Sequence, residues 1–429
     1  MRSEELTNEN LNENEDENER RYTLLINKMK KYLLLSALIS LSAMPVFADE
    51  EKKAEEEEGF TFTVVKENPI TSTKNQNRSG TCWAYSSLGF FEAELLRMGK
   101  GEYDLSEAYL THKTYEDRAK ASVRMHGDIS FSQGGSFNDC VYCMRNYGMI
   151  PQSAMPIPGE QYGDTLPNFN EFFAILEPQV NAIAKGEQKK LSPIWFKPIN
   201  STLDAYIGEV PTEFTYEGKK YTPKSFMDKL GLNMDDYISL TSFSHHPFYG
   251  EFIIEVQDNW RWGTSYNLPL DEFMETIKYA IENGYTFAWG ADVSELGFSR
   301  EGIAVCPDVE KVKETNGSDY ERWVGKAKTT DDKRKAYTAR PMPEVEVTQE
   351  KRQQAYDNWE TTDDHGMVIY GIAKDQNGKP YYMVKNSWGT DYKYKGVWYA
   401  SEAFVAYKTM NILLHKNAIP KHIAKKLFK

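Results

Sequence analysis

The sequence predicts an α+β fold in which a helical half and a β half contribute to one site. Apolar residues recur at helical spacing directly after Cys82, and two strand-like runs, 367–372 and 381–384, lie far along the chain. Between these regions, residues 271–283 form an amphipathic pattern that leads into a further strand-like run, 285–290. With 429 residues, 40% of them hydrophobic and 13% aromatic, the chain can bury a large core.

The first predicted helix begins at Cys82. The apolar positions that repeat along it are Leu88, Phe91, Leu95 and Met98. Ser79 and Thr81 are candidate caps for its first turn. A thiol at a helix start meets free N–H groups and the positive end of the dipole, which favour the nucleophilic thiolate. The alternative interpretation is a buried, unreactive cysteine, which is the usual state of a lone free Cys.

The two strand-like runs place a histidine near an asparagine. His365 opens the first run, Asn386 follows the second, and Asn377-Gly378 between them is typical of a hairpin turn. A hairpin would bring the Asn386 amide oxygen to the imidazole, where it could fix the ring orientation. The imidazole could then take the proton of Cys82. Taken alone, a hydrogen-bonded strand-end histidine and a turn asparagine remain alternatives.

A glutamine lies shortly before the cysteine. The side-chain amide of Gln76 could donate to the oxyanion that forms when a thiolate attacks a carbonyl, beside the backbone N–H of Cys82. A solvated loop glutamine is the alternative.

The middle of the chain supplies a second helix and a buried strand. The apolar face of the predicted helix, 271–283, consists of Phe273, Ile277, Ala280 and Ile281. Gly284 is expected to end this helix, and residues 285–290 are expected to form a buried strand.

Three motifs together resemble the papain-like cysteine peptidases. They are Gln-x5-Cys-Trp-Ala from Gln76, His365-Gly366, and Lys-Asn-Ser-Trp-Gly from Lys385 to Gly389. Leu105-Ser106-Glu107 is similar to a further segment of that family. The resemblance implies a two-subdomain fold, with a helical half and a β-barrel-like half, and a catalytic set of Cys82, His365, Asn386 and Gln76. It also implies substrate contacts at Gly134, Gly135, Ala291 and Trp388, the last of which would shield the His–Asn pair from water.

The sequence is more similar to the bleomycin hydrolase and aminopeptidase C branch. The interval from Cys82 to His365 is about twice the roughly 130–150 residues of the papain pattern, and that branch carries long insertions there. The resemblance spans residues 64–429 and implies insertions at roughly 155–280 and 307–360. Further similar segments are Asn146 to Pro151, Ala288 to Val293 and Lys416 to Pro420.

The branch resemblance also bears on where substrates are cut. In that branch a C-terminal arm lies in the cleft, offers a carboxylate to the substrate amine and restricts cleavage to chain ends. This chain stops at Lys429, so the arm is expected to be short, and Asp292 and Glu295 are candidate carboxylates. The resemblance further implies no metal or organic cofactor, and a homo-oligomer, which is a hexamer in related enzymes.

The N-terminal region is expected to be processed. Residues 29–48 have a basic start, an apolar centre and a small residue at the exit, which is typical of a signal peptide. Residues 1–28 are expected to be a disordered, low-complexity extension, which we interpret as non-native, with Met29 as the native start; a regulatory extension is the alternative. Residues 49–58 form an acidic linker, and residues 59–429 form the peptidase domain. We therefore expect a periplasmic or extracellular protein with no membrane attachment after cleavage; a buried helix or an uncleaved anchor is the alternative.

The net charge limits the possible partners, and the cysteines and histidines limit the possible metal sites and disulfides. The net charge of −13 argues against nucleic acid or an anionic membrane as a partner. Cys140-x-x-Cys143 is expected to lie in a core helix, with a metal half-site or a local disulfide as alternatives. His245-His246, before a Pro in a turn, is expected to be structural or substrate-lining, and a metal site is the weaker interpretation.

The sequence as a whole predicts an exported cysteine peptidase that acts on peptides, most simply as an aminopeptidase. An endopeptidase or an acyl transferase on the same fold is an alternative within enzymes. A non-catalytic binding protein is an alternative of another class, although such proteins usually lose one catalytic residue and this chain keeps all four.

Overall fold

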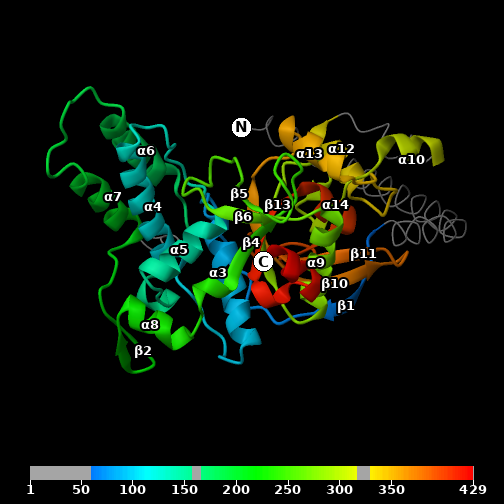
Figure 1. Ribbon diagram of the computed structural model, residues 1–429, viewed down its shortest axis with the longest axis horizontal. Coiled ribbons are helices and arrows are strands. Elements are labelled where there is room, and N and C mark those ends of the chain that lie inside the picture. The colour runs from blue at the N-terminus through cyan, green and yellow to red at the C-terminus, as the bar shows by residue number, and fades with distance from the viewer. Residues whose placement is uncertain (1–58, 157–165, 316–328, 429) are drawn as a thin grey trace, which may run out of the picture. The chain divides into compact units, whose positions relative to one another are not determined.

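The computed structural model describes residues 59–156, 166–315 and 329–428 (Figure 1). Residues Phe60–Lys429 form one compact unit, separate from Met1–Gly59. Among the described residues, no helix has both the length and the apolar character needed to cross a membrane.

The three segments expected at the N-terminus are not tested by the structure. The extension 1–28, the signal peptide 29–48 and the acidic linker 49–58 all lie outside the described residues.

The helical half lies on the left of Figure 1 and includes a small hairpin. Its described elements are α3 (Cys82–Arg97), α4 (Glu107–Arg124), α5 (Phe137–Asn146), α6 (Asn170–Ala184), α7 (Lys197–Ile207), α8 (Pro223–Leu230), β2 (Phe214–Tyr216) and β3 (Lys219–Tyr221). The caps are encoded locally: the Ser106 hydroxyl accepts from Tyr109 N at 3.1 Å at the start of α4, and Ser136 with Asp139 forms a capping box on α5.

Helix α3 is the central helix of the fold. Every residue from Trp83 to Leu95 is buried, so the helix is enclosed on all sides and not only on the apolar face that the sequence predicts. It packs against helices α4 and α5 and also against strands β7 and β10 of the sheet. Its N-terminus therefore lies where the two halves meet.

The β half is built on an eleven-stranded sheet. Its order is β5-β6-β4-β13-β7-β10-β11-β12-β9-β8, with β1 paired to β10 outside this path. The strands are β1 (Phe62–Glu67), β4 (Tyr237–Thr241), β5 (Glu251–Ile253), β6 (Thr264–Asn267), β7 (Phe287–Ala291), β8 (Phe298–Ser299), β9 (Ile303–Ala304), β10 (His365–Asp375), β11 (Pro380–Lys385), β12 (Val397–Ser401) and β13 (Thr409–His415).

The predicted hairpin is confirmed as β10 and β11. The two strands pair antiparallel, with Val368 opposite Lys385, and Gly378 adopts a φ of +79° in the connecting loop. On its other side, β10 pairs with β7, with His365 opposite Ala291. The strand register thus places His365 at the end of β10 that adjoins the end of β11.

The remaining helices lie in the β half. They are α9 (Leu270–Glu282), α10 (Val309–Thr315), α12 (Thr330–Tyr337), α13 (Gln349–Asp357), α14 (Glu402–Lys408) and α15 (Lys421–Leu427); short 3-10 turns cover Gln152–Ala154, Met234–Asp236 and Lys416–Ala418. The predicted helix at 271–283 and the strand after it are confirmed as α9 and β7.

The two regions expected as insertions are integrated into the core. Residues 155–280 contribute α6 to α8 to the helical half and β4 to β6 to the central sheet. In the region 307–360, helix α13 buries Arg352 completely. The Arg352 guanidinium donates to the backbone carbonyls of Ser242 and Ala406, at 2.7 and 3.1 Å. Described residues of both regions thus take part in the packing of the molecule.

Candidate active site

Cys82 is the first residue of α3. Thr81 occupies the N-cap position but makes no capping bond with its side chain, so the predicted hydroxyl cap is wrong. Its hydroxyl lies 2.6 Å from that of Ser79, which itself donates to the backbone carbonyl of Gln76 at 2.7 Å. These hydroxyls therefore stabilise the loop before the helix and do not satisfy its first turn.

The start of β10 packs directly on the start of α3. A Cβ on Gly366 would lie 2.5 Å from Ser86 Oγ and 3.4 Å from the Cys82 carbonyl oxygen. The backbone of Gly366 also hydrogen-bonds to the Cys82 sulfur and favours its thiolate. Only glycine permits this approach, and it brings the neighbouring residue, His365, to the cysteine.

His365 is held by Asn386 and covered by Trp388. The imidazole Nε2 lies 2.8 Å from Asn386 Oδ1, as the hairpin predicts. The Trp388 ring lies over the imidazole, with the ring centroids 4.9 Å apart. Because Nε2 is engaged by the amide, Nδ1 is the ring nitrogen that remains for the sulfur. His365 and Asn386 are both buried.

Gln76 is fixed by the loop that follows Asn386. Its Oε1 accepts from the Ser387 hydroxyl at 2.6 Å, and its Nε2 donates to the Ser79 carbonyl at 2.8 Å. A primary amide has two N–H donors, so one remains after this bond. Gln76 also lines the same cavity as Cys82, which suits an oxyanion donor.

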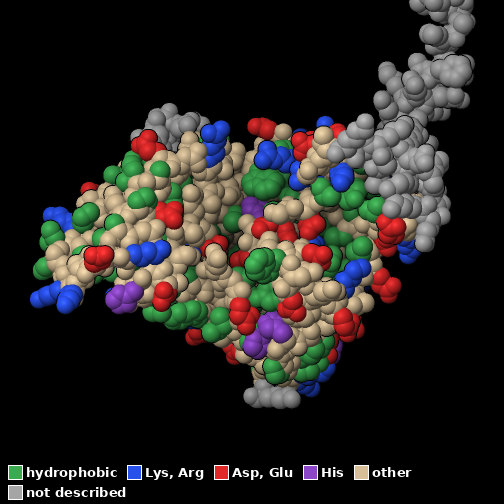
Figure 2. Space-filling model, turned by 90° about the horizontal axis from the view of Figure 1, so that it is seen from above, with side chains coloured by type: hydrophobic (Ala, Val, Ile, Leu, Met, Phe, Trp, Pro, Cys, Tyr) green, Lys and Arg blue, Asp and Glu red, His purple; other side chains and the backbone are tan. Residues whose placement is uncertain are grey.

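These residues share one cavity of about 740 Å³ between the two halves. Its lining includes Gln76, Cys82, Gly134, Gly135, His365 and Trp388. Figure 2 shows the surface hollowed between the helical part on the left and the sheet part on the right. Of the expected substrate-binding residues, Ala291 is the exception: it has no exposed surface, and its neighbour Gly290 lines the cavity instead.

Gly134 and Gly135 are required by close packing. A Cβ on Gly134 would lie 1.8 Å from Asp258 Oδ2, and one on Gly135 would lie 2.8 Å from the Trp83 ring. Both distances are far shorter than van der Waals contact, so no other residue fits without rearrangement. The absence of side chains leaves this backbone accessible along the cavity.

Burial disfavours the charged forms of both reacting groups. It raises the pKa of the Cys82 thiol to about 12 and lowers the pKa of the His365 imidazole to about 4. Backbone hydrogen bonds from Gly366 and Trp83 act in the opposite direction on the thiol, and they favour the thiolate. Proton transfer between the two groups creates opposite charges side by side, which compensate one another.

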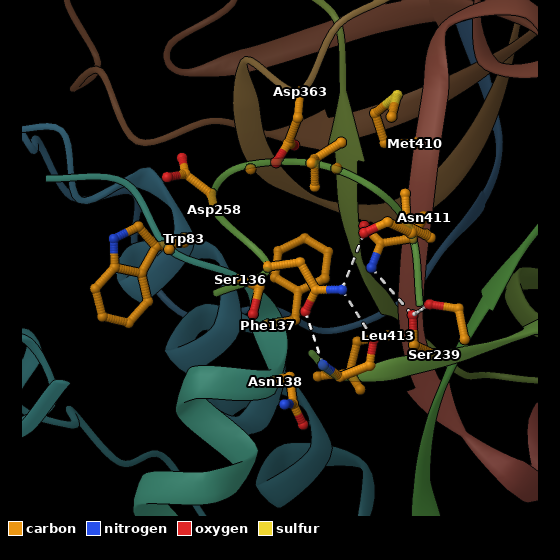
Figure 3. Close-up of a pocket in the computed structure, with 18 of the residues that line it drawn as sticks. Trp83, Ser136, Phe137, Asn138, Ser239, Asp258, Asp363, Met410, Asn411 and Leu413 are labelled. Carbon is orange, nitrogen blue, oxygen red and sulfur yellow. Dashed lines mark hydrogen bonds between the residues drawn. The ribbon is translucent and has the colours of Figure 1, made fainter. Parts of the chain in front are cut away.

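Carboxylates that the sequence did not single out also line the cavity. Asp258 and Asp363 lie near one another on one side of it (Figure 3). Asp258 Oδ1 accepts from Arg118 at 3.4 Å and from the Ser132 hydroxyl at 3.2 Å. Asp363 has no hydrogen-bond or ion-pair partner in the described part of the chain, and burial with the charge of Asp258 raises its pKa to about 7.

The carboxylates proposed from the sequence are occupied elsewhere. Asp292 is 3% exposed and accepts from the backbone of Ser294 at 2.9 Å and of Thr362 at 3.0 Å. Glu295 forms an ion pair with Lys408. Neither lines the cavity, so the expectation that they meet the substrate amine is wrong. Asp363-Asp364, directly before His365, is the sequence signal that could have indicated a carboxylate at the cavity.

The other cysteines and the C-terminus lie away from the thiol. Cys140 and Cys143 are free thiols buried in α5, so the predicted core helix is confirmed. In helix α15, Ile423 and Leu427 pack into the core of the β half. None of the described residues after Leu413 lines the cavity.

The chain is similar to known peptidases over most of its length. Residues 316–429 match the Peptidase C1-like family. The chain is 24% identical over 418 residues to aminopeptidase C of Streptococcus thermophilus, covering 86% of this chain and 85% of that protein. It is 22% identical over 398 residues to aminopeptidase G of Lactobacillus delbrueckii subsp. lactis, covering 83% of each.

Among solved structures, PepW from Lactobacillus rhamnosis HN001 is similar with a TM-score of 0.63 and 19% sequence identity. The superposition covers 92% of this chain and 94% of that chain. The predicted papain-like α+β fold is thereby confirmed.

Proposed function

Because the chain is a papain-like, C1-like cysteine peptidase and a distant homologue of aminopeptidase C, we propose that it releases N-terminal residues from peptides. Cys82 is the nucleophile, His365 the general base and acid, and Asn386 the residue that orients the imidazole. Gln76 and the Cys82 N–H hold the oxyanion. The observation that carries this proposal is the His365–Asn386 bond of 2.8 Å, which holds His365 at the cavity that Cys82 and Gln76 also line.

The proposed reaction proceeds through a thioester. The Cys82 proton moves to His365 Nδ1, and the thiolate attacks the carbonyl carbon of the peptide. The carbonyl oxygen thereby acquires a negative charge, which Gln76 stabilises. The C–N bond breaks as the imidazolium protonates the leaving amine. Water, deprotonated by His365, then hydrolyses the thioester and restores the thiol. Trp388 over the imidazole keeps solvent from the His–Asn bond.

Restriction to the N-terminal residue is supported by two carboxylates at the cavity, Asp258, which Arg118 partly compensates, and Asp363. Asp258 Oδ2 lies against Gly134, and the unpaired Asp363 is nearby. A substrate ammonium has three donors and a positive charge, and it would supply the partner that Asp363 lacks. A peptide without a free amine would instead place neutral groups against two carboxylates, which costs binding energy.

Export and self-assembly are parts of the same proposal. Export is supported by the basic-then-apolar pattern of residues 29–48, and N-terminal sequencing should find a mature chain that begins near Asp49. Intact Met1 on soluble cytoplasmic protein would overturn export. A homo-oligomer is proposed from the family resemblance alone, and light scattering of the purified protein tests it.

Matched peptides test the cleavage mode. Peptides with free and N-acetylated termini are incubated with the enzyme, and mass spectrometry identifies the products. We expect single N-terminal residues to be released from the free peptides and acetylation to block release. Rapid internal cleavage of acetylated peptides would assign an endopeptidase. Transfer of the acyl group to an added amine in place of hydrolysis would assign an acyl transferase.

A further inference from the structure

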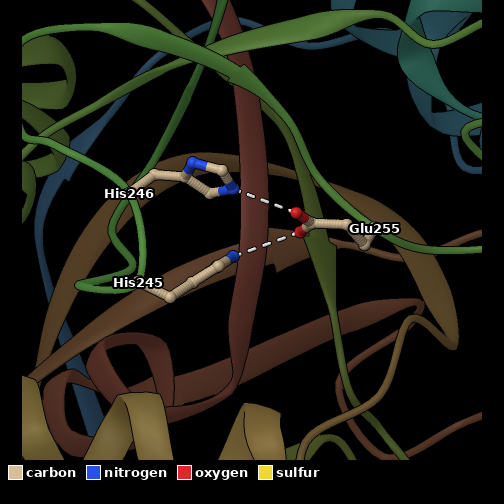
Figure 4. A group of neighbouring side chains, drawn as sticks. All are labelled: His245, His246 and Glu255. Atoms are coloured by element: carbon tan, nitrogen blue, oxygen red, sulfur yellow. Dashed lines mark hydrogen bonds and ion pairs between the residues drawn. The ribbon is translucent and has the colours of Figure 1, made fainter.

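Two adjacent histidines and a glutamate converge on the surface of the β half. His245 and His246 follow β4, and Glu255 follows β5. His245 Nε2 lies 3.1 Å from Glu255 Oε2, and His246 Nε2 lies 3.0 Å from Glu255 Oε1 (Figure 4). One ligand atom from each residue lies within 4.8 Å of the others, and among the described residues this is the one such group found.

We propose that His245, His246 and Glu255 form a binding site for a divalent transition metal, with zinc as the best match. Two imidazole nitrogens and one carboxylate oxygen are a set of ligands that zinc takes with a fourth position left to water. Bonds of about 2.0–2.1 Å in tetrahedral geometry place neighbouring ligand atoms about 3.3 Å apart. The two histidine–glutamate separations, 3.0 and 3.1 Å, are close to this value, and the histidine nitrogens lie within 4.8 Å of one another.

Gln353 holds the His245 ring in place. Gln353 Oε1 accepts from Ser244 N at 2.6 Å, and its Nε2 donates to Asp357 Oδ1 at 2.8 Å, which together fix the amide orientation. His245 Nδ1 lies 3.1 Å from Gln353 Nε2 and 3.3 Å from Gln353 Oε1, so Nε2 is the ring nitrogen that faces Glu255. When a cation binds Nε2, the ring carries its proton on Nδ1, where Gln353 Oε1 can accept it.

Neighbouring rings hold the other two ligands in place. The Phe252 ring stacks on His246, with centroids 4.3 Å apart. The Tyr356 hydroxyl donates to the Glu255 backbone carbonyl at 3.2 Å and lies 3.3 Å from Glu255 Oε2.

A metal here would tie a cavity wall to helix α13. Ile254 and Val256 line the active-site cavity on either side of Glu255, and Asp258 follows shortly after. Gln353 and Tyr356, which contact two of the ligands, belong to α13. The metal would therefore act by fixing the 242–258 segment and not by contact with the substrate.

Zinc binding to the full, untagged chain tests the site. Cys82→Ala is the parent, because it removes the reactive thiol as a competing ligand. Titration against a chromophoric chelator at neutral pH should show one zinc per chain, and His246→Ala and Glu255→Gln should abolish it. The control is His422→Ala, which removes an exposed histidine 3.4 Å from Glu275 that has no second histidine; it should bind as the parent does. Absence of one-to-one binding, or binding unchanged in Glu255→Gln, would overturn the site.

A second measurement separates ligation from misfolding. Zinc should raise the melting temperature of the parent and of His422→Ala but not of His246→Ala, because only the folded state offers the site. Gln353→Ala should keep the stoichiometry and lower zinc affinity about 10–100-fold, as expected when a residue that orients a ligand is removed. Gln353→Glu, which still accepts from Nδ1–H, should restore it. Equal melting shifts in all variants would contradict the proposal.

Discussion

The two halves of the molecule position their active-site residues in different ways. The helical half places Gln76 in the loop before α3 and Cys82 at the first residue of that helix, a short way apart in the chain, although Ser387 of the β half also bonds Gln76. The β half places His365 and Asn386 at the ends of two paired strands, where the register of β7, β10 and β11 decides the outcome. The first arrangement depends mostly on residues close in sequence, and the second depends on the whole sheet. Substitutions in the two halves should therefore affect activity differently.

Removal of either member of the reacting pair should have the largest effect. We expect Cys82→Ala and His365→Ala to lower kcat/KM by at least about 10⁴-fold each, and the double variant to lose little more, because the two act as a unit. Peptide hydrolysis measured for the three variants tests this. Additive losses would show that the halves act independently.

Iodoacetamide labelling checks the same pair. It should modify Cys82 and abolish activity, because the other cysteines lie outside the cavity. Cys143→Ala serves as the control and should remain active and sensitive to the reagent. Labelling of Cys140 or Cys306 with activity retained would contradict the assignment.

The supporting amides should differ between the halves. Gln76→Ala should lower kcat by about 10–1,000-fold, the scale of one lost oxyanion donor. Asn386→Ala should cost less than His365→Ala, since the amide orients the base and transfers no proton. Steady-state kinetics of both variants test this, with circular dichroism as the control for folding. A folded Asn386→Ala as inactive as His365→Ala would mean that the register alone does not hold the ring.

Loss of the Asp363 carboxylate should weaken the use of free-amine peptides and change how kcat/KM depends on pH. Asp363→Asn should lower kcat/KM for free-amine peptides by about 10–100-fold, the scale of one charged hydrogen bond. Because the pKa of Asp363 is raised to about 7, kcat/KM should rise as pH increases through 7, and the variant should lose this limb. Asp235→Asn is the control, since this cavity residue is already paired with Arg145 at 2.8 Å. A limb that persists in Asp363→Asn would exclude its role.

The smallest expected effect is on thermal stability, where Asp363→Asn should raise the melting temperature at high pH. A carboxyl whose pKa is raised on folding favours the folded state while protonated, and this contribution is lost as pH rises through 7. Asp363→Asn should therefore raise the melting temperature above pH 7 and leave it nearly unchanged below pH 4. Thermal melts at the two pH values test this. A variant that is less stable at high pH would mean that Asp363 has a native partner.

The contrast between the halves also explains what the sequence could predict. Cys82 at a helix start and the β10–β11 hairpin follow from local patterns, and the structure places both as expected. Asp258 could not be predicted from the sequence, because it lies in an irregular segment. The hydrogen bond that holds its carboxylate comes from Arg118, which is far away in the chain. Asp292 was chosen for its strand but is satisfied by two backbone amides, a result of tertiary packing that no spacing reveals.

The pairing of β1 with β10 has a consequence for how the chain matures. Phe62 lies opposite Asp375, so the first strand of the sheet waits for a partner that is synthesised some three hundred residues later. Contacts of such sequence separation form late and slowly. We therefore expect a nascent chain to carry its cysteine without a base until nearly all of the chain has been synthesised. Peptidase activity would thus arise only late in folding, once β10 has joined the sheet.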